Sequence, residues 1–170
     1  MPESVIMAAD PPELTVTDAD AWRAWLVDNH LDTTGGVWVR LAKKGHTDPT
    51  SLSYDQALDE AICHGWIDGQ VRRGDATSFW QRFTPRRARS IWSANNVVRV
   101  ARLTAEGRMR AAGLAQVEAA KADGRWEAAY AGQSSMPVPD DLAAALAANP
   151  AAQAMFDVLT SQNRYAILHR

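Results

Sequence analysis

Two short stretches in the middle of the chain contain most of the residue types that form ligand and catalytic sites. The first, residues 63–69, reads Cys-His-Gly-Trp-Ile-Asp-Gly, and the second contains Arg-Phe-Thr-Pro-Arg-Arg at 82–87 and Ser-Ile-Trp-Ser at 90–93. Indole rings supply flat apolar walls, guanidinium groups bind carboxylates and phosphates through paired hydrogen bonds, and His and Asp transfer protons. A site in this protein is therefore expected to draw on these two stretches.

Positive charge is concentrated in the same region. Ten arginines lie between positions 72 and 110, against only Asp75 and Glu106, in a chain whose formal net charge is -2. A local excess of arginine attracts anions even where the whole chain is slightly acidic. The sequence thus predicts an anionic partner for this segment, and it argues against nucleic-acid binding driven by total charge.

A cleft walled by tryptophan and rimmed by arginine is the site that these residues favour. Such a cleft suits a small anionic or amphipathic ligand or peptide, or a nucleotide. The competing interpretation is that the tryptophans belong to the core and that the arginines pair with carboxylates elsewhere, including Asp59 and Asp68. The predicted ligand-binding residues are Trp66, Asp68, Arg82, Arg86, Arg87 and Trp92.

Catalysis is a further alternative. Strand alternation places Trp66 and Asp68 on the same face, so Asp68 is either a partner of an arginine or the best acid or base in the chain. An enzyme would be centred on Asp68, His64 and Arg82. Cys63 is a weak nucleophile candidate, because a single cysteine on an apolar helix face is usually a small buried hydrophobe.

A metal site is disfavoured, and no cofactor is expected. Glu60 and His64 lie four residues apart on one predicted helix, with His46, Asp59 and Cys63 nearby, but two ligands do not make a site. The chain has neither a glycine-rich phosphate-binding motif nor a nucleophile-elbow motif. Ser93 is read instead as the cap of a helix whose first amides can bind an anion beside the arginines.

The elements around these residues predict an α+β fold. A strand at 13–16, a helix capped by Thr17 and running to about His30, and a strand at 37–41 come first. A second helix, capped by Ser53, ends at Gly65, and a hairpin of 66–71 with 78–83 follows. These strands make a small antiparallel sheet of three to four strands with flanking helices. The C-terminal half is helical, with helices at about 93–106 and 109–123 and others starting at Asp140 and Pro150.

The same reading gives a domain layout. Residues 1–12 form a disordered or extended leader, 13–131 the α+β core, 132–139 a linker, and 140–170 a helical segment that packs on the core. At 170 residues and 46% hydrophobic content the chain is long enough for one compact domain. No apolar run reaches the length of a membrane span, and the single Cys63 agrees with a reducing compartment, so a cytoplasmic protein is expected. Its oligomeric state is not predicted.

Several motifs together resemble the YdeI/OmpD-associated family, whose members are also called bacteriocin-protection proteins. They are Gly-Trp-Ile-Asp-Gly at 65–69, Arg-Phe-Thr-Pro-Arg at 82–86, Trp92-Ser93 and Glu-Gly-Arg-Met at 106–109, within a stretch from about Trp38 to Trp126. Members usually continue past a Ser-x-x-x-Tyr segment, here 161–165, into a basic helical tail, whereas this chain stops at Arg170. The resemblance implies a role in stress or antimicrobial tolerance. We therefore favour a non-catalytic ligand-binding protein, with a nucleic-acid binder using the arginines of 82–110 and an uncharacterised enzyme as alternatives.

Overall fold

The computed structural model describes residues 10–31, 35–129 and 137–168. The chain divides into two compact units, one made of residues 1–90 with 100–120 and the other of residues 91–99 with 121–170. Most of the predicted leader and of the predicted linker lies outside the described residues, and the packing of the C-terminal segment on the core stays a prediction.

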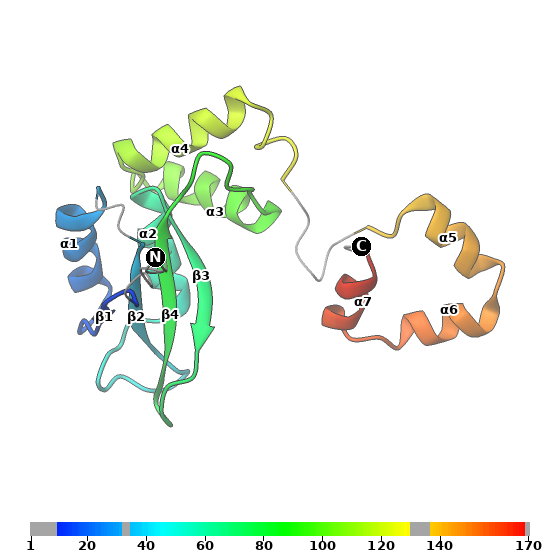
Figure 1. Cartoon of the computed structure of the whole chain (residues 1–170), viewed down its shortest axis with the longest axis horizontal. Coiled ribbons are helices and arrows are strands. Elements are labelled where there is room, and N and C mark those ends of the chain that lie inside the picture. Colours follow the sequence, from blue (N-terminus) through cyan, green and yellow to red (C-terminus); the bar gives the residue numbers. More distant parts are fainter. Residues whose placement is uncertain (1–9, 32–34, 130–136, 169–170) are drawn as a thin grey trace, which may run out of the picture. The chain divides into compact units, whose positions relative to one another are not determined.

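Four strands of the first unit form one sheet (Figure 1). They are β1 (Glu13–Leu14), β2 (Val37–Ala42), β3 (Trp66–Arg72) and β4 (Ser78–Pro85), in the spatial order β1-β2-β4-β3. β4 pairs antiparallel with both β2 and β3, while the short β1 pairs parallel with β2. The predicted α+β class is confirmed, and the sheet is mixed because β1 enters beside β2 in the same direction.

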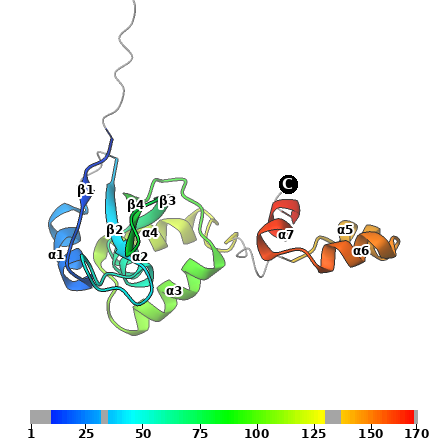
Figure 2. The same ribbon diagram turned by 90° about the horizontal axis from the view of Figure 1, so that it is seen from below.

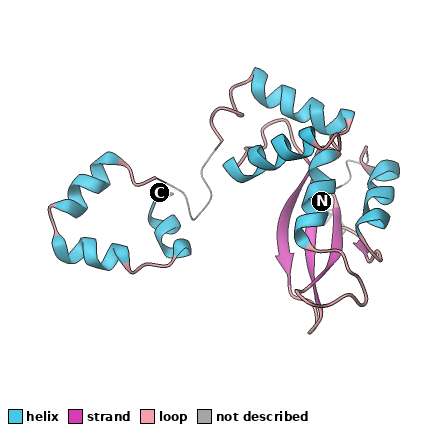
Figure 3. Cartoon of the chain, turned by 180° about the vertical axis from the view of Figure 1, so that it is seen from behind, coloured by secondary structure: helices cyan, strands magenta, loops and turns pink. Residues whose placement is uncertain are grey.

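The described part of the chain contains seven helices. α1 (Ala19–Asn29) and α2 (Tyr54–Cys63) lie on one face of the sheet (Figures 2 and 3). The later helices are α3 (Ala94–Ala105), α4 (Ala111–Ala122), α5 (Asp140–Ala147), α6 (Pro150–Asp157) and α7 (Ser161–Leu168). The helices predicted from Asp140 and Pro150 start at those residues, and α7 is an additional helix that the sequence pattern did not separate.

Local capping explains where α1 and α2 begin. Ser53 forms the predicted cap of α2, and a full capping box links it to Gln56. The prediction that Thr17 caps α1 is wrong. Asp18 is in the extended conformation and its carboxylate accepts the amide of Ala21, so the cap lies one residue later. The left-handed Gly65 (φ 79°) follows α2 and turns the chain into β3.

Aromatic side chains form the core between the sheet and α1. Trp22 stacks on Trp25 at 5.2 Å and packs against Phe83 at 5.6 Å, while Trp25 meets the edge of Trp66 at 5.8 Å. The indole N–H of Trp22 donates to the carbonyl of Ala57 at 3.1 Å, and that of Trp66 donates to the carbonyl of His30 at 2.9 Å. These buried indoles are therefore satisfied by the fold itself.

Strand register divides the sheet residues between two faces. Val37, Val39 and Leu41 of β2 lie opposite Phe83, Gln81 and Phe79 of β4 and face the helices. Trp38 and Arg40 lie opposite Arg82 and Trp80, and these four residues point to the other side. We call this second side the outer face; it also includes Thr84 with its partner Ile67, and Arg72 with its partner Trp80.

Among the described residues, no helix combines the length and the apolar character that crossing a membrane requires.

Candidate functional site

The outer face holds a hollow lined by two of the predicted ligand-binding arginines. Its volume is about 270 Å³, and it lies near the end of the β3–β4 pair at which β3 begins and β4 ends. Arg82, Thr84 and Ile67 reach it from the outer face of the strands. None of the described lining residues is acidic; they are Ile67, Gly69, Gln70, Arg82, Thr84, Pro85, Arg87 and Ser90.

A β-bulge shapes one wall of this hollow. The register of β3 against β4 shifts between Asp68 and Val71, which places Gly69 and Gln70 outside regular pairing. The buried Gln81 stabilises the bulge by donating its side-chain amide to the carbonyls of Gly69, at 2.9 Å, and Gln70, at 3.1 Å. The wall is therefore fixed from inside the sheet.

The guanidinium of Arg82 is oriented but not saturated. Its Nη2 donates to the carbonyl of Gly35 at 2.7 Å, which fixes the direction of the side chain. Its Nε is buried and finds no acceptor among the described residues. A buried donor without an acceptor costs free energy.

The other predicted site residues are placed in three different surroundings. Trp66 and Asp68 share the helix side of β3, as alternation predicted, so they lie on the opposite face from Arg82. Arg86 is buried, whereas Arg87 is exposed at the hollow, where its backbone N–H donates to the hydroxyl of Ser90 at 3.0 Å. Trp92 belongs to the second unit, where its ring meets that of Trp126 at 5.0 Å.

Asp68 and Trp66 are thus occupied by contacts within the fold. The carboxylate of Asp68 accepts the hydroxyl of Tyr54 at 2.7 Å. The Trp66 side chain is 1% exposed and lies in the aromatic core. Of the predicted site residues, the structure brings Arg82 and Arg87 together in one hollow, and it places Trp66 and Asp68 outside that hollow.

Cys63 and His64 have environments that oppose nucleophilic chemistry. Burial, reinforced by the charge of Glu60, raises the pKa of the Cys63 thiol to about 11, so the thiolate is disfavoured at neutral pH. Burial lowers the pKa of His64, whose Nδ1 donates to the carbonyl of Glu60 at 2.9 Å. Its Nε2 therefore carries the lone pair, and it has no partner among the described residues. The ring of His30 lies 5.8 Å away between centroids.

Glu60, considered above as a metal ligand, binds arginines instead. It is 3% exposed and accepts hydrogen bonds from Arg23, at 2.8 and 3.0 Å, and from Arg108, at 2.6 Å. Burial alone would raise the pKa of Glu60, but the hydrogen bonds from both arginines outweigh it and hold that pKa below its ordinary value. Its neighbour Asp59 accepts two bonds of 2.7 Å from Arg102.

These ion pairs divide the arginine-rich segment. Arg102 and Arg108 bind carboxylates of α2 and Glu106, so they do not belong to an open basic surface. A second hollow, of about 420 Å³, lies beside this network and has Arg23, Glu60 and Arg108 among its lining residues. Within the ranges that the structure describes, no group of three or more His, Cys, Asp or Glu side chains could hold a metal ion.

A stack of arginine and tryptophan on the outer face was not singled out as a unit by the sequence. The Arg72 guanidinium lies over the ring of Trp38, at 4.7 Å, and over the ring of Trp80, at 5.5 Å. Arg40 lies over the same Trp80 ring at 5.5 Å. The sequence signal for this stack was the alternation in β2, which puts Trp38 and Arg40 on one face. Only the register of β2, β4 and β3 shows that Trp80 and Arg72 lie beside them.

The fold and the hollow together define a small α+β domain with an arginine-lined outer face. The chain belongs to the family described as a domain of unknown function (DUF8412), whose model matches residues 14–116, more than half of the chain. Residues 135–170 match a second family model, described as Bacteriocin-protection, YdeI or OmpD-Associated. No curated protein and no solved structure matched the chain.

The resemblance to the YdeI/OmpD-associated family is therefore confirmed, with a different extent. The family model covers the C-terminal helices, whereas the motifs quoted for the resemblance lie within the part matched by the DUF8412 model.

Proposed function

We propose that this protein binds a small anionic ligand, without catalysis, in the hollow lined by Arg82 and Arg87. The observation that carries the proposal is the pairing of two arginines with no acidic residue among the described lining. Thr84, Ser90 and Gln70 add hydroxyl and amide groups to the same lining. Guanidinium and hydroxyl groups are the common partners of phosphate and carboxylate oxygens in proteins.

The size of the hollow favours a small ligand or one end of a larger one. A volume of about 270 Å³ lies just below the range of drug-sized pockets, roughly 300–1,000 Å³. Arg87 is exposed, so its side chain can adjust to the ligand, while Arg82 is held by Gly35. One fixed and one adaptable cation suit a single phosphate or carboxylate group.

The two alternatives have weaker support. An enzyme centred on Asp68, His64 and Arg82 would need these groups around one substrate, yet Arg82 lies on the face opposite Asp68 and His64 is buried. A nucleic-acid surface built from the arginines of 82–110 would lack Arg102 and Arg108, which bind Asp59 and Glu60.

A role in tolerance of bacteriocins or other antimicrobial peptides is the biological part of the proposal. It is supported by the description of the family that matches residues 135–170. We place this role in the cytoplasm, in keeping with the single buried cysteine. This role can be tested by exposing three strains to a bacteriocin and comparing their survival. One strain lacks the gene, and the other two are the same cells complemented by the gene or by an Arg82→Ala version. Equal survival of all three strains would remove it.

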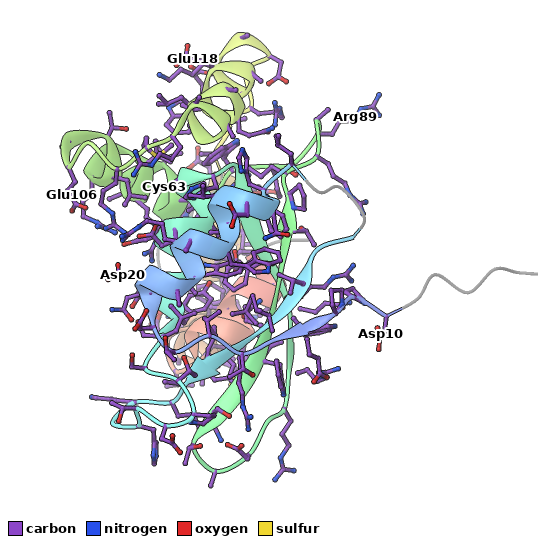
Figure 4. All side chains as sticks on the ribbon, turned by 90° about the vertical axis from the view of Figure 1, so that its left-hand side faces the viewer. Asp10, Asp20, Cys63, Arg89, Glu106 and Glu118 are labelled. Carbon is purple, nitrogen blue, oxygen red and sulfur yellow. The ribbon has the colours of Figure 1, made fainter. Side chains whose placement is uncertain are left out.

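Calorimetric titration with inorganic phosphate and with citrate tests the binding itself. We expect saturable binding to the full chain that is lost in Arg82→Ala and weakened at least tenfold in Arg87→Ala. Arg89→Ala is the matched control, because Arg89 is exposed, extends outward from the same loop and does not line the hollow (Figure 4). Binding that is absent from the full chain, or equally affected by Arg89→Ala, would reject the proposal.

A further inference from the structure

The residue directly opposite Arg82 is Trp38, and it also has an unsatisfied polar atom. The Trp38 side chain is only 7% exposed, and its indole Nε1 has no acceptor among the described residues. The Nε of Arg82 is in the same condition, and the two residues are cross-strand partners on the outer face. Buried N–H groups are almost always hydrogen-bonded in native structures, so two unpaired donors on facing residues mark a place where the fold leaves polar atoms unsatisfied.

Beyond Trp38, the outer face presents a cationic surface. The guanidinium of Arg72 lies over the rings of both Trp38 and Trp80, and the Arg72 side chain is still 38% exposed. An ion pair with Glu13 holds it in place from β1. An exposed guanidinium can stack on a nucleobase as it does on an indole.

The first unit leaves this surface accessible. α1 lies on one side of the strands, and side chains extend from the other side, where none of the described helices of the first unit lies (Figure 4). The polar hollow and the cationic surface are adjacent, because Arg82 lines the hollow and the Arg72 guanidinium lies over its cross-strand partner Trp38.

We propose that the ligand of this site is a nucleotide, with its phosphate in the hollow at Arg82 and Arg87 and its base stacked on the Arg72 guanidinium above Trp38. This inference rests on the proposed function and specifies the ligand class. The sugar lies over the Trp38–Arg82 pair, between the phosphate and the base. Phosphate and base thus use separate residues, which makes their contributions separable.

Four probes separate the two contributions: adenosine 5′-monophosphate, ribose 5-phosphate, adenosine, and a 5′-phosphorylated single-stranded oligonucleotide. We expect the monophosphate to bind about tenfold more tightly than ribose 5-phosphate, a difference of about 1.4 kcal/mol. Adenosine alone should bind more weakly still. An oligonucleotide that binds no better than the monophosphate identifies a free nucleotide as the ligand, and one that binds at least tenfold better identifies the terminus of a single strand.

Variants at Arg72 test the stacking. Arg72→Lys keeps the charge but loses the guanidinium plane, so it should reduce monophosphate affinity to that of ribose 5-phosphate and leave ribose 5-phosphate affinity unchanged. Arg73→Ala, an exposed neighbour, is the matched control and should change neither. The indole N–H signal of Trp38 should shift when the monophosphate binds to the unaltered protein, a readout that requires no variant to fold.

The outcomes distinguish the two proposals. If ribose 5-phosphate binds but the base adds no affinity, or if Arg72→Lys weakens both ligands equally, the nucleotide inference is overturned while the anion site stands. If none of the phosphorylated probes binds, both are overturned.

Discussion

Replacing Glu60 with glutamine should destabilise the first unit strongly, although it changes only one oxygen to an amide group. Glu60 is 3% exposed and holds Arg23 of α1 and Arg108, which precedes α4, against α2. Removing one partner of a buried ion pair costs about 3–5 kcal/mol. The two arginines keep 39% and 33% of their side-chain exposure, so solvent compensates part of this cost. The glutamine oxygen can also accept one of the lost bonds, and we therefore expect a loss of about 2–3 kcal/mol.

Urea unfolding followed through the indole N–H signal of Trp22 measures this loss in the first unit, because that N–H is bonded to Ala57 of α2. The exposed Glu127→Gln is the matched control and should lie within about 0.5 kcal/mol of the unaltered protein. The double variant Glu60→Gln with Arg23→Gln should be less destabilised than the sum of the single variants by at least about 1 kcal/mol. A Glu60→Gln variant as stable as Glu127→Gln would show that the two arginines do not depend on this carboxylate.

Two further predictions concern the same unit. Gly113→Ala should destabilise the first unit by about 1–2 kcal/mol in urea unfolding, although alanine is the better helix former. The reason is that a Cβ at this position would lie 2.3 Å from the carbonyl oxygen of Cys63. A gain in stability would contradict the close packing of α4 on the end of α2. Stability should also fall as the pH is lowered below about 6.5, because burial holds the folded pKa of His64 below its ordinary value of 6.5 and the unfolded chain takes up the proton first. Glu60 contributes only below its ordinary pKa of 4.5, so the slope measured between pH 5 and 7.5 should disappear in His64→Gln. A slope that persists in that variant would assign it to another group.

Local signals in the sequence were sufficient for most of the elements. The Ser53 cap, the glycine after α2 and the alternation in β2 depend on neighbouring residues, and each is found in the structure. The cap of α1 was misplaced by one residue because Thr17 and Asp18 both carry an oxygen that can accept the helix amides, and only backbone conformation decides between them.

The candidate site depended on information that is not local. Alternation correctly placed Trp66 and Asp68 together, but the face occupied by Arg82 follows from the register of β2 against β4 and from the bulge after Asp68. Arg108 binds Glu60, which lies 48 residues away in the chain, so its role within the fold was not visible from charge alone. Composition indicated an anionic partner, whereas the register decides which arginines remain available to it.

The most direct test of the anion site is a phosphate titration observed at the Nε–Hε signals of the arginines. We expect the signals of Arg82 and Arg87 to shift together and to saturate with one dissociation constant, while that of Arg102, already bound to Asp59, does not move. Small shifts that grow linearly at all exposed arginines, with no saturation at Arg82, would contradict it.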